Sequence, residues 1–158
     1  MDDEATRFLS DLEARHGGSI GFRTYSTWFA CNDGTVREFG VFLFMVGDMF
    51  HFEDFERKPA IFGFPIKPRK KDAPFVKYER SFSADDVESV TAVLKTKASD
   101  CAAGHIASNQ INQVNSFDRL FRSLVHRVVL KDGTTYFFEL IDSKKFMLAL
   151  EGGRHGSV

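Results

Sequence analysis

The sequence predicts a mainly β fold, α+β by content, in which a curled antiparallel sheet or barrel is capped by a C-terminal helix and preceded by an extra N-terminal helix. Alternating or β-branched runs separated by Asn-Asp-Gly, Gly-Asp and Lys-Asp-Gly turns recur along residues 19–141. Apolar residues at helical spacing stand near both ends of the chain. The 18 Phe, against 3 Tyr and 1 Trp, require a sheet that curls or packs to bury them.

The chain length and composition predict a single domain spanning residues 1–158. A chain of 158 residues buries about two thirds of its unfolded surface around one core. The acidic start lacks the basic and apolar regions of a secretory signal, and no apolar stretch is long enough to cross a membrane. We therefore expect a cytoplasmic protein without a transmembrane segment, in which Cys31 and Cys101 are reduced.

The N-terminal third should contain one helix followed by strands. Phe8, Leu9 and Leu12 share one helical face, and glycines follow the last periodic residue, so we expect a helix over 3–16. Two runs, 19–31 and 35–46, flank an Asn-Asp-Gly turn and predict a hairpin. The all-apolar run Val41–Val46 fits a central strand covered on both faces.

The middle of the chain alternates between strand and loop signals. The run 49–55 places Phe50 and Phe52 on one face of a strand and His51 and Glu53 on the other. Further strands are expected at 60–64, at 75–82 and, after an acidic turn, at 87–97. Small and amide side chains dominate residues 99–116, which predicts a long mobile loop.

The last third contains a helix, a hairpin and a second helix. Phe117, Leu120 and Phe121 recur at helical spacing behind an Asn-Ser cap, so a short helix should precede the next strand. A Lys-Asp-Gly turn then joins the strands 124–130 and 135–141. Asp142 and Ser143 can cap a final helix over 143–151, which we expect to end at the glycines that follow.

The stretch from Arg80 to Glu151 resembles the pleckstrin-homology and GRAM superfold. The resemblance lies in Phe82–Val90, which looks like the acidic turn into a strand, and in the hairpin Val128–Phe138. The expected helix at 143–150 is then what such a barrel uses to plug its open end. The first hairpin loop lacks the basic-x-basic pattern that phosphoinositide-binding members usually hold there. What the resemblance implies is therefore a PH-like barrel that serves as a binding module.

The sequence carries no recognisable catalytic motif, and we predict that the protein is not an enzyme and needs no cofactor. Gly-rich phosphate loops, Gly-x-Ser-x-Gly elbows, His-Glu-x-x-His and paired Cys motifs are all missing. His51 and Glu53 could supply two metal ligands if His126 came from a neighbouring strand, but no metal site is predicted.

The basic side chains cluster in one segment of a nearly neutral protein. Residues 57–80 carry a net charge of +6, which leaves −7 on the rest of the chain. The prolines within this segment place its basic run, Lys67, Arg69, Lys70 and Lys71, in a loop. Such a loop either keeps the protein solvated or binds an anionic partner. Nucleic acid is not expected, because the sequence pI is about 6.5 and the patch is short.

Two binding functions follow as hypotheses. In the first, the PH-like module contacts an anionic membrane surface or an acidic protein segment through Lys67, Arg69, Lys70 and Lys71. In the second, the protein is an interaction or scaffold domain, and Phe side chains exposed on an uncovered strand or on the N-terminal helix form a homodimer or dock a protein partner.

Overall fold

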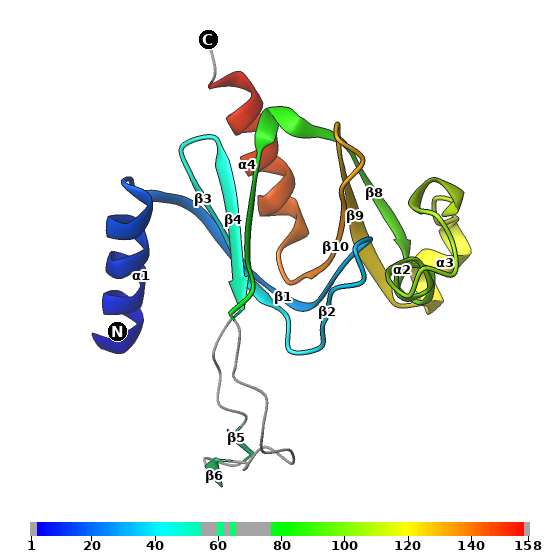
Figure 1. The fold of residues 1–158 in the computed structure, drawn as a ribbon, viewed down its shortest axis with the longest axis horizontal. Coiled ribbons are helices and arrows are strands. Elements are labelled where there is room, and N and C mark those ends of the chain that lie inside the picture. The colour runs from blue at the N-terminus through cyan, green and yellow to red at the C-terminus, as the bar shows by residue number, and fades with distance from the viewer. Residues whose placement is uncertain (1–2, 55–59, 62–63, 66–76, 157–158) are drawn as a thin grey trace.

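The computed structural model describes residues 3–54, 60–61, 64–65 and 77–156. Within them, seven strands follow the order β7-β4-β3-β1-β10-β9-β8 in one antiparallel sheet, and β2 adds to β1 as an eighth. The sheet curls into a half-barrel around helix α4 (Figure 1). The predicted fold class is therefore confirmed. The strands are β1 (Ile20–Cys31), β2 (Val36–Arg37), β3 (Val41–Val46), β4 (Met49–Asp54), β7 (Glu79–Ser83), β8 (Val87–Leu94), β9 (Leu124–Leu130) and β10 (Thr135–Leu140).

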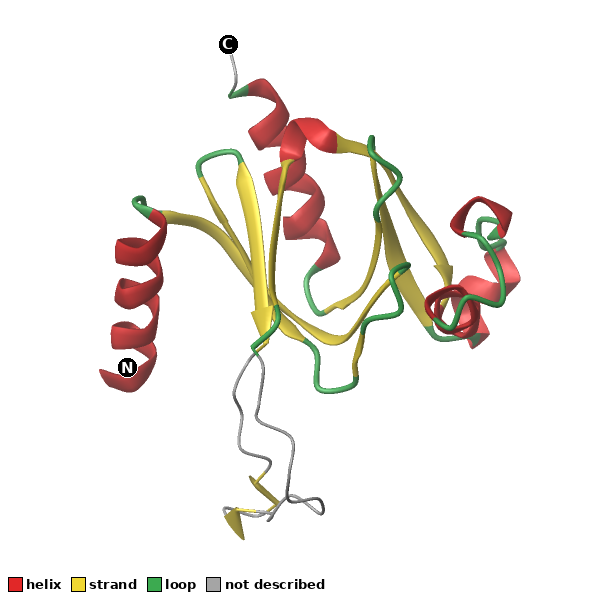
Figure 2. Ribbon diagram, viewed as in Figure 1, coloured by secondary structure: helices red, strands yellow, loops and turns green. Residues whose placement is uncertain are grey.

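Helices lie on both surfaces of the curled sheet (Figure 2). α1 (Asp3–His16) packs on the outer face beside β3, and its bounds agree with the prediction. α2 (Lys95–Ala102) and α3 (Ser116–Phe121) belong to a second outer layer beside β8, β9 and β10. Two short 3₁₀ turns, η1 (Ala84–Asp86) and η2 (Ser108–Gln110), and a separate pair of two-residue strands, β5 (Ala60–Ile61) and β6 (Phe64–Pro65), complete the elements.

The interior of the half-barrel is filled by aromatic rings from the concave face and by α4 (Ser143–His155). Phe146 of α4 lies 5.3 Å from Phe50 and 6.1 Å from Phe22, measured between ring centroids. Phe29 packs at 5.0 Å against Phe52 and at 5.1 Å against Phe138. Seven of the 18 Phe residues belong to this core, as the period-two pattern predicts for the concave face.

The C-terminal helix is longer than the sequence predicts. Asp142 caps it by accepting a hydrogen bond from the Lys145 amide at 3.1 Å, as expected. The helix does not stop at the glycines but continues to His155. A Cβ on Gly153 would lie 2.6 Å from Met45 Cε and 2.8 Å from Ala84 Cβ, so glycine here allows the helix to approach the sheet closely. The predicted end at residue 151 is therefore wrong.

Three other expectations are corrected. The second run of the first hairpin is split into β2 and β3 around Gly40, which has φ +76° and approaches the Ser26 carbonyl too closely for any side chain. The strand predicted over 87–97 ends at Leu94, and the predicted loop 99–116 holds the end of α2, η2 and the first residue of α3. Ala98, Cys101 and Ala102 make a small-residue stripe that buries against the sheet, so packing outweighs local strand propensity.

Candidate functional site

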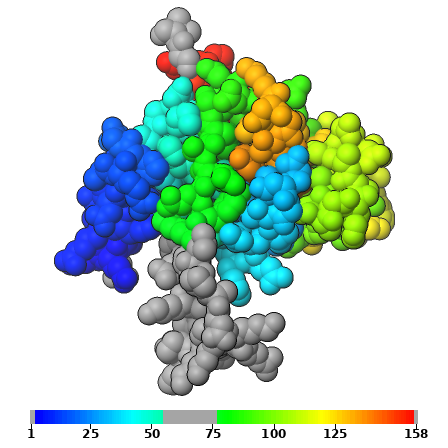
Figure 3. All heavy atoms as spheres, in the orientation of Figure 1, coloured from blue at the N-terminus to red at the C-terminus, as the bar shows by residue number. Residues whose placement is uncertain are grey.

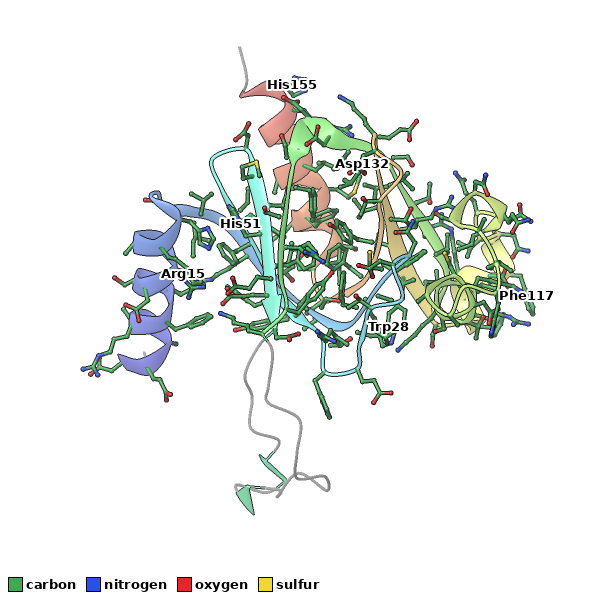
Figure 4. All side chains as sticks on the ribbon, viewed as in Figure 1. Arg15, Trp28, His51, Phe117, Asp132 and His155 are labelled. Atoms are coloured by element: carbon green, nitrogen blue, oxygen red, sulfur yellow. The ribbon has the colours of Figure 1, made fainter. Side chains whose placement is uncertain are left out.

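The most exposed group of large apolar side chains that shares one helix face lies on α3. Phe117 is 63% exposed, Leu120 77% and Phe121 71%. The rings of Phe117 and Phe121 lie 4.9 Å apart, so the side chains form one continuous surface, which we call the α3 stripe. Phe117 points outward at the end of the molecule farthest from α1 (Figure 4). Clustered exposed apolar side chains of this kind mark binding surfaces, whereas isolated ones need no explanation.

The local sequence explains why this short segment is helical. The Asn115 side chain caps the helix by accepting a hydrogen bond from the Asp118 amide at 2.8 Å. Arg122 lies one turn after Asp118 and forms an ion pair with it at 3.4 Å. The positions 117, 120 and 121 then fall on one side of the helix. The sequence correctly predicts this helix, but not that its apolar face is left uncovered.

The segment that carries α3 is fixed to the sheet at both ends. The Val114 amide donates to the Ala92 carbonyl at 3.4 Å, and the Lys95 amide donates to the Ser123 carbonyl at 3.0 Å. These bonds tie the start and the end of α3 to the region where β8 becomes α2. We call residues 95–123 the α2–α3 platform. A stripe held in this way loses little conformational freedom when a partner binds.

The platform is also fixed from below by Arg127 of β9. Its guanidinium donates to the Ser108 carbonyl at 2.7 Å and to the Ile111 carbonyl at 2.9 Å. The same side chain donates to Thr91 Oγ1 at 3.1 Å. Ile111 is buried against the outer face of the sheet together with Phe137. One cation therefore satisfies the carbonyls of an irregular segment that would otherwise have to face water.

The charges near the α3 stripe are mainly basic. Arg119 lies on the helix and Arg122 caps its C-terminal end, and the one acidic residue of α3, Asp118, is paired with Arg122. Burial, together with the charge of Arg119, lowers the pKa of His126 on the adjacent strand, so this imidazole is neutral at pH 7. Arg119, Arg122 and Asp118 leave a net charge of +1 beside the apolar stripe, which suits a partner surface that carries a carboxylate.

A second group of polar side chains lies where α1 meets the sheet. His16, His51, Glu53, Glu79, Arg80 and Ser81 line, with Phe52, an open depression of about 160 Å³. The carboxylate of Glu53, only 4% exposed, is bonded to Arg15 at 2.9 Å and to Lys77 at 3.0 Å. The depression is smaller than the roughly 300 Å³ at which sites for metabolite-sized ligands begin.

The histidines do not assemble a metal centre. His51 lies on β4 and His126 on β9, and three strands of the sheet separate the two. The condition for the metal hypothesis, a neighbouring strand that carries His126, is therefore not met. Across residues 3–54, 60–61, 64–65 and 77–156, no three His, Cys, Asp or Glu side chains are grouped so that they could hold an ion.

The interior thiol and phenols are held in their protonated forms. Burial raises the pKa of Cys31 to about 11 and that of Tyr136 to about 12. Tyr78 lies between the guanidinium groups of Arg37 and Arg80, which are 4.9 Å and 5.2 Å from its ring centroid. A thiol with so high a pKa is a poor nucleophile at neutral pH, so Cys31 is a packing residue.

The two binding hypotheses name different surfaces, and the structure describes only one of them. The basic loop residues Lys67, Arg69, Lys70 and Lys71 lie outside the described residues, so the loop hypothesis stays a prediction. The apolar face of α1 is not exposed, because Leu12 is buried and Phe8 packs at 5.5 Å against Phe42. Among the described residues, the exposed Phe side chains are Phe117 and Phe121 on α3 and Phe39 between β2 and β3, whereas the hypothesis placed them on an uncovered strand or on the N-terminal helix.

No family model matches this chain, and neither the curated proteins nor the solved structures contain a match. Among the residues that the structure describes, none of the helices is both long enough and apolar enough to cross a bilayer.

Proposed function

We propose that this protein is a non-enzymatic binding module that docks a protein partner through the α3 stripe. The observation that carries the proposal is the exposure of Phe117, Leu120 and Phe121 on a helix fixed at both ends. The curled antiparallel sheet around a C-terminal helix supports the PH-like relationship that is part of this proposal. The module offers a rigid anchor of the kind that dominates binding energy at interfaces.

The partner is a protein with an apolar groove whose rim carries carboxylates. Three side chains on less than two turns of helix offer much less than the roughly 800 Å² per partner of a stable interface. A dimer held only by two copies of the stripe would therefore be too small. A groove in a second protein can surround the anchor, and an acidic residue at its rim would pair with Arg119.

Photo-crosslinking followed by titration tests the proposal. A photoreactive phenylalanine analogue at position 117 should trap one protein in cells, and the same analogue at position 148 should not. Leu148 is a matched control because it is 67% exposed but lies on α4. The trapped protein is then purified and titrated against the module. Leu120→Asp should raise the Kd by about tenfold or more, and Leu148→Asp should leave the Kd unchanged.

Two other outcomes would overturn the proposal. If the purified protein is a dimer in sedimentation equilibrium and Leu120→Asp makes it a monomer, the stripe serves self-association. If the protein sediments with vesicles of phosphatidylcholine and phosphatidylserine and Leu120→Asp abolishes this, the stripe inserts into a membrane surface. Equal effects of Leu120→Asp and Leu148→Asp on Kd would also contradict it.

A further inference from the structure

The C-terminal end of α1 contacts the sheet through a stack of three rings. His16, the last residue of the helix, lies 4.1 Å from His51 of β4 between ring centroids and 5.1 Å from Phe44 of β3. Phe44 and His51 are themselves stacked at 5.4 Å. We call these three residues the histidine stack. His51 points from β4 toward α1, and Arg15 reaches toward the same part of the sheet (Figure 4).

Each element packed around the stack, except β3, brings charged groups. α1 contributes Arg15, and β4 contributes Glu53. Lys77 and, on β7, Glu79 and Arg80 lie beside the stack, Glu13 precedes His16 by one turn of α1, and Arg23 of β1 lies opposite Phe44 in the sheet. The Glu53 and Glu79 carboxylates are already paired with cations, so the surroundings are slightly positive while the imidazoles are neutral. Protonation of both rings would add two charges of the same sign about 4 Å apart, which is unfavourable.

The histidine stack is open to solvent, but the environment of His51 disfavours its protonation. Both imidazoles line the open depression, which is wide enough for several water molecules. Burial, and to a smaller extent the neighbouring His16, lowers the pKa of His51 below its usual value. A histidine whose pKa is lowered by folding favours the open state as the pH falls below about 6.5. This loss continues until the pH reaches the lowered value in the folded protein.

α1 is attached to the sheet weakly enough for two charges to matter. Leu12 is the one buried residue of the helix, while Phe8 and Leu9 are only partly covered. Gly17, with φ +72°, follows His16 directly and can serve as a hinge. A helix of 14 residues is also marginal in water once it is detached. Release from the sheet would therefore unfold α1 and leave the rest of the sheet in place.

We propose that the histidine stack is a proton-operated latch that holds α1 on the sheet when its imidazoles are neutral and releases the helix in mild acid. Release uncovers Phe42 and Phe44, which are buried beneath α1 in the closed state. The latch keeps this second apolar face covered at neutral pH and presents it in mild acid. The latch is independent of the α3 stripe, which lies at the other end of the molecule.

Hydrogen exchange of the full chain tests the latch. Protection factors, corrected for the intrinsic pH dependence of exchange, are compared at about pH 7.5 and about pH 5.5. The amides of α1 should lose protection at the lower pH, because the lowered pKa of His51 in the closed state makes protonation favour the open state. The amides of β9 and β10 should change little. His51→Phe keeps a stacked ring without a titrating group and should remove most of the loss, whereas His16→Phe should remove only the smaller part that comes from the neighbouring ring.

His105→Phe is the matched control, because His105 is exposed in the loop after α2 and should not alter the response. A direct titration of the imidazole resonances adds a readout that does not depend on opening. His51 should titrate below 6.5, and His16→Phe should raise its pKa. The proposal is overturned if α1 keeps its protection in acid, if α1 loses as much protection in His51→Phe as in the unaltered protein, or if β9 and β10 open together with it.

Discussion

Helix α1 and the α2–α3 platform both cover the outer face of one sheet, at opposite sides of the molecule (Figure 3), but they are held in different ways. Beneath α1, the buried apolar cluster consists of Leu12, Phe42 and Phe44. Beneath the platform, a larger cluster joins Trp28 and Phe137 to buried residues of α2, β8 and β9. The platform is also bonded to the sheet through Arg127, whereas α1 is bonded through Arg15 to the buried carboxylate of Glu53 and through Glu13 to the Ile20 amide.

This difference indicates that α1 can detach from the sheet more easily than the α2–α3 platform. An irregular segment such as 103–115 can remain in place only if its carbonyls find donors, and Arg127 supplies them. A helix satisfies most of its own backbone groups, so α1 can be docked by side chains alone. The platform is therefore suited to present a fixed binding surface, and α1 is suited to detach.

The largest expected effect separates the two covers by a matched pair of substitutions. Phe137 and Phe44 are both fully buried, one beneath the platform and one beneath α1. Phe137→Ala should lower the free energy of unfolding by about 3–5 kcal/mol. Phe44→Ala should cost less than about 3 kcal/mol, the lower end for buried Phe, because molecules that have released α1 no longer bury Phe44. Urea denaturation measures both, and equal losses would show that α1 is not a separable cover.

An intermediate effect is expected from the removal of the Arg127 guanidinium. Arg127→Met keeps most of the apolar stem but leaves the Ser108 and Ile111 carbonyls without their donor. We expect a loss of about 1–3 kcal/mol. In hydrogen exchange the loss should be confined to residues 103–123, with α1 unchanged. Arg122→Met removes an exposed ion pair from the same region and should cost less than about 1 kcal/mol.

The smallest effect should come from the exposed part of the ion network beside α1. A hydrogen bond from Lys77 is the main cause that lowers the pKa of Glu79, so the stability from this contact is present above about pH 4.5 and is lost as the pH falls. The Glu79 side chain is 53% exposed, and solvent screening limits its contribution to roughly 0.5 kcal/mol. Glu79→Gln should therefore lower stability slightly at neutral pH, and thermal denaturation should show no difference near pH 3.

The sequence correctly predicts those helices and strands whose local residue pattern agrees with their packing in the fold. The bounds of α1, the alternation of Phe50 and Phe52, and the Asp142 cap of α4 are all confirmed. The predicted strand at 95–97 is wrong because the small stripe of Ala98, Cys101 and Ala102 extends helical packing back to Lys95. The spacing of these three residues was the signal that could have found α2.

The candidate sites depend on long-range placement, which local patterns do not contain. The spacing of Phe117, Leu120 and Phe121 predicts a helix face, but only the tertiary structure shows that nothing in the described chain covers it. His16 and His51 come from different elements, and no sequence pattern brings them into contact. Both sites therefore required the structure.

The pairing of β1 has a consequence for how the protein is made. This strand lies in the middle of the sheet between β3 and β10, and its residue Ser26 lies opposite Leu140 of β10. Residues 135–140 must be synthesised before β1 can form backbone hydrogen bonds along both of its edges. A nascent chain stalled before that point would carry an unpaired strand edge next to Trp28 and Phe29. Such an edge can be bound by a chaperone, or it can pair with another chain and start aggregation.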